Sequence, residues 1–160
     1  MKLTIFLIIV SVLSLSACQT DTTYHQYREV PSAGWSRKDT ISFPLPADFT
    51  YHRYALEIGL RHTEAYPYKD LWVEIIHPLT PVIPPDTIHL RLADKKGNWF
   101  GAGSSNCLYQ FTQSLGTITC YPADSLLQVT HLMSTPLTGI TDIGIRLSLP
   151  RGIDTKEYKQ

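Results

Sequence analysis

The residues with the clearest chemical meaning form the segment Leu15–Cys18, which reads LSAC and directly follows an apolar run. Lys2 and the nine-residue run at 5–13 have the charge and length of the first two parts of a signal peptide. Small residues before the cut suit a signal peptidase, and a cysteine directly after it has a thiol that can carry a diacylglycerol. The pattern is typical of a bacterial lipobox, which predicts cleavage between Ala17 and Cys18 and lipid attachment at Cys18.

Two other interpretations of the N-terminal segment stay open. It could be an ordinary secretory signal peptide in which the cysteine occurs by chance. A transmembrane helix is a poorer match, because the apolar run is well short of the roughly 18 residues needed to span a bilayer. After cleavage, residues 18–160 remain, a length that suits one domain with a single core.

The charge of the mature chain argues against two classes of partner. Once Lys2 is removed, 13 basic side chains stand against 14 acidic ones, and the sequence has no run of basic residues. Binding to nucleic acid therefore has no electrostatic support, and neither has binding of the protein surface itself to anionic lipid. Membrane attachment is predicted to come from the lipid at Cys18, because two or more acyl chains such as palmitate anchor a protein stably.

Two cysteines remain after Cys18, namely Cys107 and Cys120. Export would place them in an oxidising compartment, and their spacing suits two neighbouring strands or a hairpin. A Cys107–Cys120 disulfide is therefore one interpretation, and two buried free thiols are the other. A metal site at this pair is not supported, because the sequence has no CxxC motif and no histidine-rich partner for it.

The other polar residues do not form a recognised catalytic pattern. None of the six histidines has HExxH or HxH spacing, and Ser104 and Ser105 lack the GxSxG context of a nucleophile elbow. Glu57 and Glu74 could lie on neighbouring strands as a glycosidase carboxylate pair does, although two solvent-facing strand positions explain them as well. We therefore predict a protein that is not an enzyme and has no catalytic residue, cofactor, metal ion or small-molecule substrate.

Aromatic residues are the stronger indication of binding. Tyr66 and Tyr68 flank Pro67 in a loop between two predicted strands, and Trp99 lies near another predicted turn. Tyrosine and tryptophan are common anchors of protein interfaces and also form platforms on which sugar rings stack. Tyr66, Tyr68 and Trp99 are therefore candidate partner-binding residues, while an ordinary core position is the alternative for Trp99.

Along the chain, hydrophobic residues alternate with period two, and prolines and glycines stand at the turns. No helical stripe of hydrophobic residues is longer than two turns. A turn at 94–97 predicts a hairpin between the runs on either side of it. About eight strands predict an all-β fold, an antiparallel β-sandwich that is either Ig-like or jelly-roll. Strands are predicted at 40–45, 54–60, 71–76, 87–92, 98–101, 115–121, 126–132 and 143–149.

The same pattern divides the chain into four parts. Residues 1–17 are the predicted signal peptide. Residues 18–34 are polar and without clear periodicity, so we expect a lipidated N-terminus and tether that leads into an entry strand. The β-sandwich domain is predicted over 35–149, and a polar C-terminal tail over 150–160.

Four blocks of sequence occur in an order that is more specific than any of them alone. They are DTISF at 39–43, LRHTEAYPYKDL at 60–71, DTIHLRLAD with GNWFG between 86 and 101, and MSTPLTGITDIG at 133–144. With the lipobox, these blocks resemble the GldH gliding-motility lipoproteins of the Bacteroidota, with His62 where the family usually has asparagine. The segment 101–114 departs from the family pattern, which is more charged there.

The resemblance implies a membrane-anchored component of the gliding machinery, which is linked to type IX secretion. It implies envelope proteins of that apparatus as partners and Cys18 as the lipid attachment site, and it supplies no catalytic residue. A surface or periplasmic carbohydrate-binding β-sandwich is the alternative function. Gln19 after Cys18 favours the outer membrane, and the weakly acidic stretch at 19–23 favours its periplasmic face.

Overall fold

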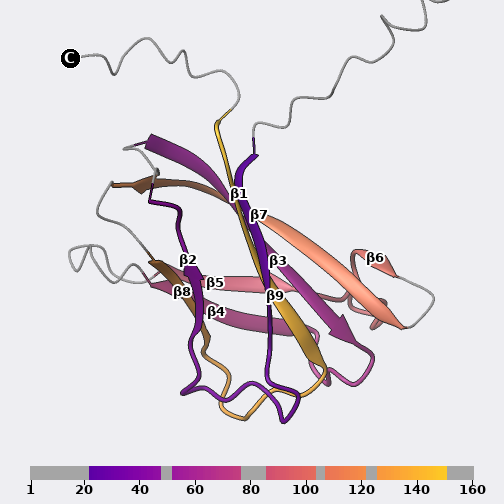
Figure 1. Ribbon diagram of the computed structural model, residues 1–160. Helices are drawn as coiled ribbons and strands as arrows, with labels where there is room; N and C mark the ends of the chain where they lie inside the picture. The colour runs from indigo at the N-terminus through magenta and orange to yellow at the C-terminus, as the bar shows by residue number, and fades with distance from the viewer. Residues whose placement is uncertain (1–21, 48–51, 77–85, 104–106, 122–125, 151–160) are drawn as a thin grey trace, which may run out of the picture.

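The computed structural model of the chain describes residues 22–47, 52–76, 86–103, 107–121 and 126–150. Within these ranges the chain forms nine strands and no helix, which confirms the prediction of an all-β fold. The strands build two antiparallel sheets that face each other as a sandwich (Figure 1). The predicted signal peptide, Cys18 and residues 151–160 lie outside the described residues.

The larger sheet has the strand order β1-β9-β3-β7-β6, and the smaller sheet has the order β2-β8-β4-β5. The strands are β1 (Thr22–Glu29), β2 (Ile41–Pro44), β3 (His52–Thr63), β4 (Asp70–Ile76), β5 (Asp86–Arg91), β6 (Ala102–Gly103), β7 (Leu108–Cys120), β8 (Leu126–His131) and β9 (Ile140–Ser148).

The pairing of the strands is nested. Strand β1 pairs with β9, β2 with β8, β3 with β7, and β4 with β5, and every pair is antiparallel. The described strands therefore pair as one long hairpin whose successive pairs alternate between the two sheets. This is the arrangement of a jelly-roll, so the strand order decides between the two sandwich types that the sequence left open. Strand β6, with two residues, only extends one edge of the larger sheet.

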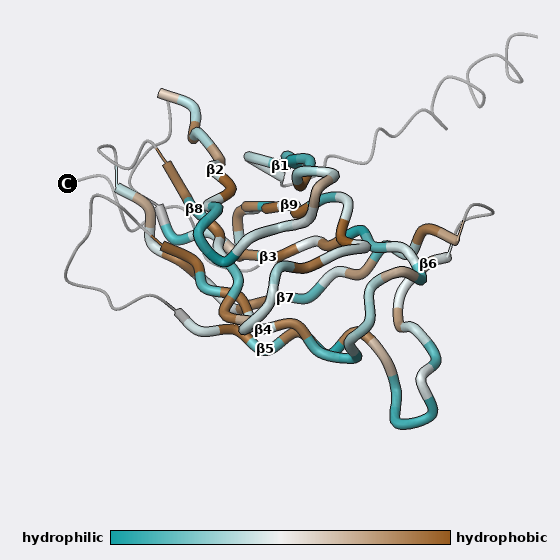
Figure 2. Tube along the Cα trace, turned by 90° about the horizontal axis from the view of Figure 1, so that it is seen from below, coloured by the Kyte–Doolittle hydropathy of each residue, from teal (hydrophilic) through white to brown (hydrophobic). Residues whose placement is uncertain are grey.

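The core lies between the inner faces of the two sheets, as the period-two pattern requires. Ile143, Ile145 and Leu147 of β9 and Leu71 and Val73 of β4 point inward and are fully buried. Hydrophobic segments, brown in Figure 2, run through strands of both sheets. Removal of this apolar surface from water supplies the main driving force for the fold.

The sandwich begins earlier than the sequence pattern indicated, because Thr22–Glu29 forms strand β1 instead of a tether. This strand pairs with β9 along its length, with an irregularity between Thr22 and Tyr24. It is an edge strand, and Tyr24 is its one buried side chain. A strand that buries so little shows almost no hydrophobic alternation, which explains why the pattern was weak.

Two further strands differ from the prediction. The predicted turn at 94–97 is present, since Gly97 N donates to Asp94 O at 3.1 Å and the chain folds back to an antiparallel bridge between Ala93 and Trp99. The hairpin is much shorter than expected, because β5 pairs with β4 and 98–101 does not form a strand. Strand β7 starts at Leu108, well before the predicted 115. Its first half is rich in glutamine, threonine and serine and is only partly buried, so its alternation is hidden.

The outer face of the larger sheet is covered by the ring of Tyr27. The ring lies flat over Gly59 of β3 and Gly144 of β9, where any Cβ atom would collide with it. The guanidinium of Arg61 lies 4.2 Å from the ring centre, a cation–π distance. Glycine at these two positions is therefore required by packing against Tyr27, although both lie in the middle of a strand.

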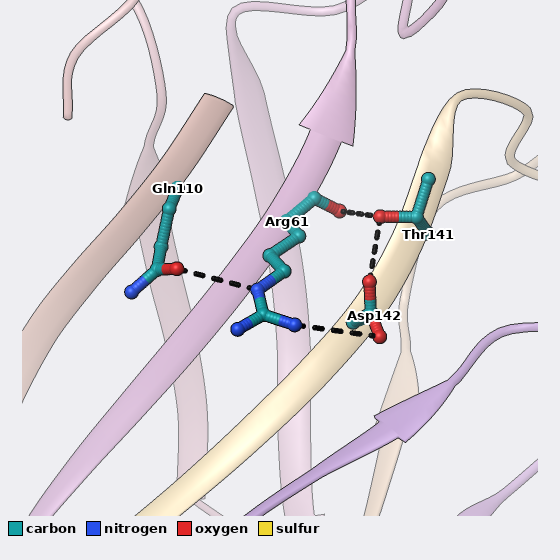
Figure 3. Close-up of polar contacts among 4 residues, drawn as sticks. All are labelled: Arg61, Gln110, Thr141 and Asp142. Carbon is teal, nitrogen blue, oxygen red and sulfur yellow. Dashed lines mark hydrogen bonds and ion pairs between the residues drawn. The ribbon is translucent and has the colours of Figure 1, made fainter. Parts of the chain in front are cut away.

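Arg61 also ties the central strands together (Figure 3). Its Nε donates to Gln110 Oε1 of β7 at 3.2 Å, and its guanidinium lies 4.0 Å from Asp142 Oδ1 of β9. The hydroxyl of Thr141 lies 3.2 Å from the carbonyl oxygen of Arg61 and 2.8 Å from Asp142 Oδ2. The charges on this face are therefore satisfied by one another across three strands.

Candidate functional site

Five aromatic rings gather at one end of the sandwich, and we call them the aromatic cluster. His62 comes from the end of β3, and Tyr66 and Tyr68 come from the loop between β3 and β4. Trp99 lies in the connection after β5, and Tyr109 is near the start of β7. Because β3 and β7 are antiparallel neighbours with His62 opposite Tyr109, the end of one strand meets the start of the other.

His62 is at the centre of the aromatic cluster. Its ring makes an edge contact with Trp99 at 4.6 Å between centroids and stacks on Tyr109 at 5.4 Å with an interplanar angle of 18°. Tyr66 is 6.0 Å away and almost fully buried, and its hydroxyl donates to the carbonyl oxygen of Asp70 at 2.9 Å. Burial raises the pKa of Tyr66, so the phenol stays neutral. His62 and Tyr66 form the buried base of the cluster, and Trp99 and Tyr109 pack on it while partly exposed.

One exposed ring packs on this base, and a second exposed aromatic residue follows Trp99 in the chain. Tyr68 is 37% exposed, with its ring 5.7 Å from Tyr66 and its hydroxyl 3.0 Å from Thr135 Oγ1. Phe100, which follows the half-buried Trp99, is 40% exposed. The Tyr109 hydroxyl donates to Glu64 Oε1 at 3.1 Å, which places a carboxylate beside the rings. The surface is aromatic with a polar margin, the composition typical of a protein-binding patch.

The structure brings the three predicted binding residues together, since Tyr66 lies 5.7 Å from Tyr68 and 6.4 Å from Trp99. Tyr66, however, is only 1% exposed and therefore supports the surface without reaching it. Sequence reasoning missed His62 and Tyr109 as members of the cluster. For His62 a signal existed, because it continues the inward series of Ile58 and Leu60 at period two.

Two histidines are fully buried, His62 in the aromatic cluster and His131 beside Trp35. His62 Nδ1 donates to the carbonyl oxygen of Thr63 at 3.2 Å, and His131 Nε2 donates to that of Trp35 at 3.0 Å. The second ring nitrogen of each has no hydrogen-bond partner among the described residues. Burial lowers the pKa of both rings, so both are neutral in the folded protein at neutral pH.

Acidification from about pH 7.5 to about pH 5 is expected to lower the free energy of unfolding. Each histidine titrates near 6.5 in the unfolded chain, whereas the lowered pKa of His62 and His131 keeps them neutral in the fold. The unfolded state therefore binds more protons, and the free energy of unfolding decreases as the pH falls through about 6.5. For each histidine the decrease is up to ~1.4 kcal/mol per pH unit. Urea unfolding at several pH values measures this slope.

A matched pair of variants tests the origin of that slope. His62→Asn should reduce it, because one buried titrating group is removed, and His25→Asn, at an exposed position of β1, is the matched surface control. An unfolding midpoint that is constant or higher at acid pH would contradict the prediction.

The predicted disulfide is wrong. Cys107 is exposed just before β7 and Cys120 is buried as its last residue, and no disulfide joins them. A single extended strand of 13 residues (Leu108–Cys120) separates them, which corresponds to about 40 Å at ~3.3 Å per residue. A disulfide requires Cα atoms within about 7 Å, so the strand excludes the bridge. The spacing resembled a hairpin because β7 was not recognised as one continuous strand.

The carboxylates do not converge on a pocket. Glu57 lies on the outer face of the larger sheet, where Arg146 donates to its Oε2 at 2.9 Å, while Glu74 lies on the outer face of the smaller sheet. The two carboxylates therefore cannot act as a glycosidase pair. An open groove of about 420 Å³ runs between the end of β1 and β2, with Arg28, Glu29 and Asp39 in its lining. Among the described residues, no three His, Cys, Asp or Glu side chains could hold a metal ion.

A second exposed aromatic group lies on the outer face of the smaller sheet. Trp72 of β4 is 43% exposed and stacks on His89 of β5 at 4.3 Å with an interplanar angle of 12°. His89 Nε2 lies 2.7 Å from Asp70 Oδ1. The outward position of His89 follows from the alternation of β5. The neighbours of Trp72 on this face are polar, so it forms a single flat platform separate from the aromatic cluster.

Comparison with known protein families identifies the family of this chain. The family model described as GldH lipoprotein matches residues 22–147, from the first residue of β1 into the end of β9. This chain belongs to the GldH lipoprotein family. The resemblance carried by the sequence blocks is thereby confirmed, and the match includes the complete jelly-roll.

Two relatives carry the same family name. The gliding motility lipoprotein GldH of Flavobacterium johnsoniae is 24% identical over 150 residues, which cover 88% of this chain and 93% of the relative. A gliding motility lipoprotein GldH homolog of Christiangramia forsetii is 27% identical over 101 residues, covering 62% and 60%. Among solved structures, the Tobacco streak virus coat protein dimer matches 84% of this chain and 92% of its own with 11% identity, but the TM-score of 0.30 supports no further argument.

The sequence blocks that resemble the GldH family meet at the aromatic cluster. The block at 60–71 contributes His62, Tyr66 and Tyr68, and the block at 97–101 contributes Trp99. They are joined by backbone hydrogen bonds, since Leu92 N donates to Lys69 O at 2.8 Å and Phe100 N donates to Leu92 O at 2.8 Å. In this member of the GldH family, segments far apart in sequence therefore form one surface.

Proposed function

We propose that this protein is a non-catalytic, lipid-anchored lipoprotein of the cell envelope that docks onto proteins of the gliding motility and type IX secretion apparatus. The observation that carries the proposal is the exposed ring of Tyr68, which lies 5.7 Å from the buried Tyr66 of the aromatic cluster, together with the exposed Phe100 that follows Trp99 in the chain. Membership of the GldH family supports the lipoprotein and gliding parts of the proposal.

The aromatic cluster has the physical properties of a binding anchor. Tyr68 is oriented by its contact with Tyr66 and by the hydrogen-bond distance to Thr135, so little rotamer freedom remains to be lost on binding. When a partner covers an exposed aromatic ring, a large area per residue is buried. Such anchors dominate the energy of protein interfaces. The surface therefore suits a protein partner with an apolar pocket that receives one or both rings.

The polar groups support a non-catalytic role. The ion pairs Arg61–Asp142 and Arg146–Glu57 lie on an outer sheet face and neutralise each other. His62 is buried beneath other rings, where no substrate reaches its ring nitrogens. An active site needs titratable groups that converge on an accessible pocket, and the aromatic cluster offers none.

The lipid at Cys18 would hold the protein at the outer membrane, facing the periplasm. Gln19 after Cys18 and the weakly acidic residues that follow support this location. Protease treatment of intact cells tests the face directly. Protection of the protein in intact cells and digestion after permeabilisation support the periplasmic face, whereas digestion in intact cells places the protein on the outer surface.

Crosslinked purification of the full-length lipoprotein from native membranes tests the docking surface. The wild-type protein should recover gliding or type IX secretion subunits in stoichiometric amounts by mass spectrometry. The double variant Tyr68→Ala/Phe100→Ala should lose at least tenfold of that recovery, because interface aromatics commonly contribute about 2 kcal/mol each.

Trp72→Ala is the matched control for this experiment. It removes an aromatic side chain of similar exposure (43%) from a different face and should leave recovery unchanged. Equal recovery by the double variant and the wild type would show that the aromatic cluster is not the docking surface. Loss of recovery in Trp72→Ala alone would indicate that the interface lies on the smaller sheet.

A carbohydrate-binding module is the second candidate, and the Trp72 platform is the observation that favours it. A flat ring with Asp70 and His89 beside it offers both stacking and hydrogen bonding to a sugar. A glycan array with the wild type and Trp72→Ala distinguishes the two functions. Binding that depends on Trp72 and persists in Tyr68→Ala/Phe100→Ala would support the module.

A further inference from the structure

Four strand ends lie together at the end of the sandwich opposite the aromatic cluster. Thr22, the first residue of β1, is paired with Ser148, the last residue of β9. His52, at the start of β3, is paired with Cys120, at the end of β7. Because Ser148 is also paired with Ala55 of β3, both pairs belong to the same end of the sheet. In Figure 1 this end lies at the top, where β1 starts and β9 ends.

The lipid attachment predicted at Cys18 would restrain this end closely. Only residues 19–21 separate Cys18 from Thr22. Even a fully extended chain spans at most about 3.6 Å per residue, so the Cα atoms of Cys18 and Thr22 can be no more than ~14 Å apart. A headgroup region adds only about 6 Å to each side of the hydrocarbon core, so a spacer of this length cannot lift the domain far from the lipid surface.

Two large hydrophobic side chains are exposed at this same end. Tyr121 follows the last residue of β7 and is 41% exposed, and Leu149 follows the last residue of β9 and is 38% exposed. Tyrosine is enriched where a membrane meets water, because its ring is apolar and its hydroxyl is polar. Arg53, the second residue of β3, is an exposed cation at this end, and a guanidinium binds phosphate well.

We infer that this end of the sandwich rests on the lipid headgroups, with Tyr121 and Leu149 at the membrane interface. The inference rests on the proposed lipid attachment at Cys18. The strands then stand away from the membrane. His62 lies ten residues beyond His52 along β3, which corresponds to about 33 Å at ~3.3 Å per residue. The aromatic cluster is thereby presented to proteins and kept out of contact with lipid.

Depth-dependent fluorescence quenching tests this orientation with the lipidated protein in vesicles of phosphatidylethanolamine and phosphatidylglycerol. In a Cys107→Ser background, a fluorophore is attached to Leu149→Cys, Tyr121→Cys or Tyr68→Cys. These three positions have similar exposure (38%, 41% and 37%), so the labels are matched. Headgroup spin-labelled lipid should quench the labels at 149 and 121 at least twofold more than the label at 68. Equal quenching, or stronger quenching at 68, would overturn the orientation.

A longer spacer provides an independent test. Twenty glycine and serine residues inserted between Asp21 and Thr22 should leave the protein bound to vesicles but reduce quenching at 149, since the short spacer no longer holds the domain down. Unchanged quenching would contradict the argument that the short spacer holds this end of the sandwich at the lipid surface. Failure of the unmodified protein to sediment with vesicles would disprove the lipid anchor, a result distinct from a wrong orientation.

Discussion

Replacing Cys18 with alanine is expected to move the protein almost completely from the membrane fraction to the soluble fraction. Each buried methylene of an acyl chain contributes about 0.8 kcal/mol, so loss of two or more chains removes nearly all membrane affinity. The sequence has no basic run that could replace the lipid by electrostatic adsorption. Among the described residues, no helix is long and apolar enough to cross a membrane. Fractionation of cells followed by immunoblotting measures the effect.

Cys107→Ser is the matched control, because it removes a second exposed thiol and should leave the protein in the membrane fraction. Washing with high salt separates lipid anchoring from electrostatic adsorption, which salt weakens. If Cys18→Ala stayed with salt-washed membranes, the lipid-anchor hypothesis would be wrong, and the inferred orientation of the sandwich would lose its basis.

Trp35→Ala is expected to cause the largest loss of stability, about 3–5 kcal/mol. Trp35 is fully buried and joins the connection between β1 and β2 to the end of β8 and the connection that follows it. Its backbone exchanges two hydrogen bonds of 2.8 Å with Leu137, and its Nε1 donates to the carbonyl oxygen of Asp39 at 3.0 Å. The His131 ring packs edge-on against it at 5.0 Å. Alanine would leave a cavity and free the connection between β1 and β2.

Trp72→Ala is the matched substitution on the surface. It removes the same side chain from a position that is 43% exposed, so we expect a loss within about 1 kcal/mol. Urea unfolding followed by circular dichroism compares both variants with the wild type. If Trp35→Ala does not fold, Trp35→Phe keeps the fold measurable and should lose less. Equal effects at positions 35 and 72 would contradict the assigned role of Trp35.

The sequence predicted strands best where every second side chain is buried in the core. Strand β9 lies between β1 and β3, and its alternation of Ile143, Ile145 and Leu147 with polar or glycine residues was read correctly. The bounds of the entry strand that became β1 were not predicted, and the first half of β7 was missed. Both bury few side chains completely, and a strand without buried residues shows little alternation.

The aromatic cluster was predicted only in part. Tyr66, Tyr68 and Trp99 were selected because of their type and their position near turns, and the structure places them together. Local sequence could not show that Tyr66 would be buried or that Tyr109 would stack on His62, because both depend on how loops pack across the end of the sandwich. Two cysteines that seemed close in sequence are separated by the full length of β7.

The sequence by itself determined the class of fold and the family, and it predicted the lipid site. Alternation of side chains, turn residues and the LSAC motif are local properties, and each is readable within a few neighbouring residues. Only the tertiary structure decided the jelly-roll order, the exclusion of the disulfide and the opposite placement of the aromatic cluster and the start of β1. These features depend on which distant strands become neighbours, and that choice is made by burial of their shared inner face rather than by any one strand.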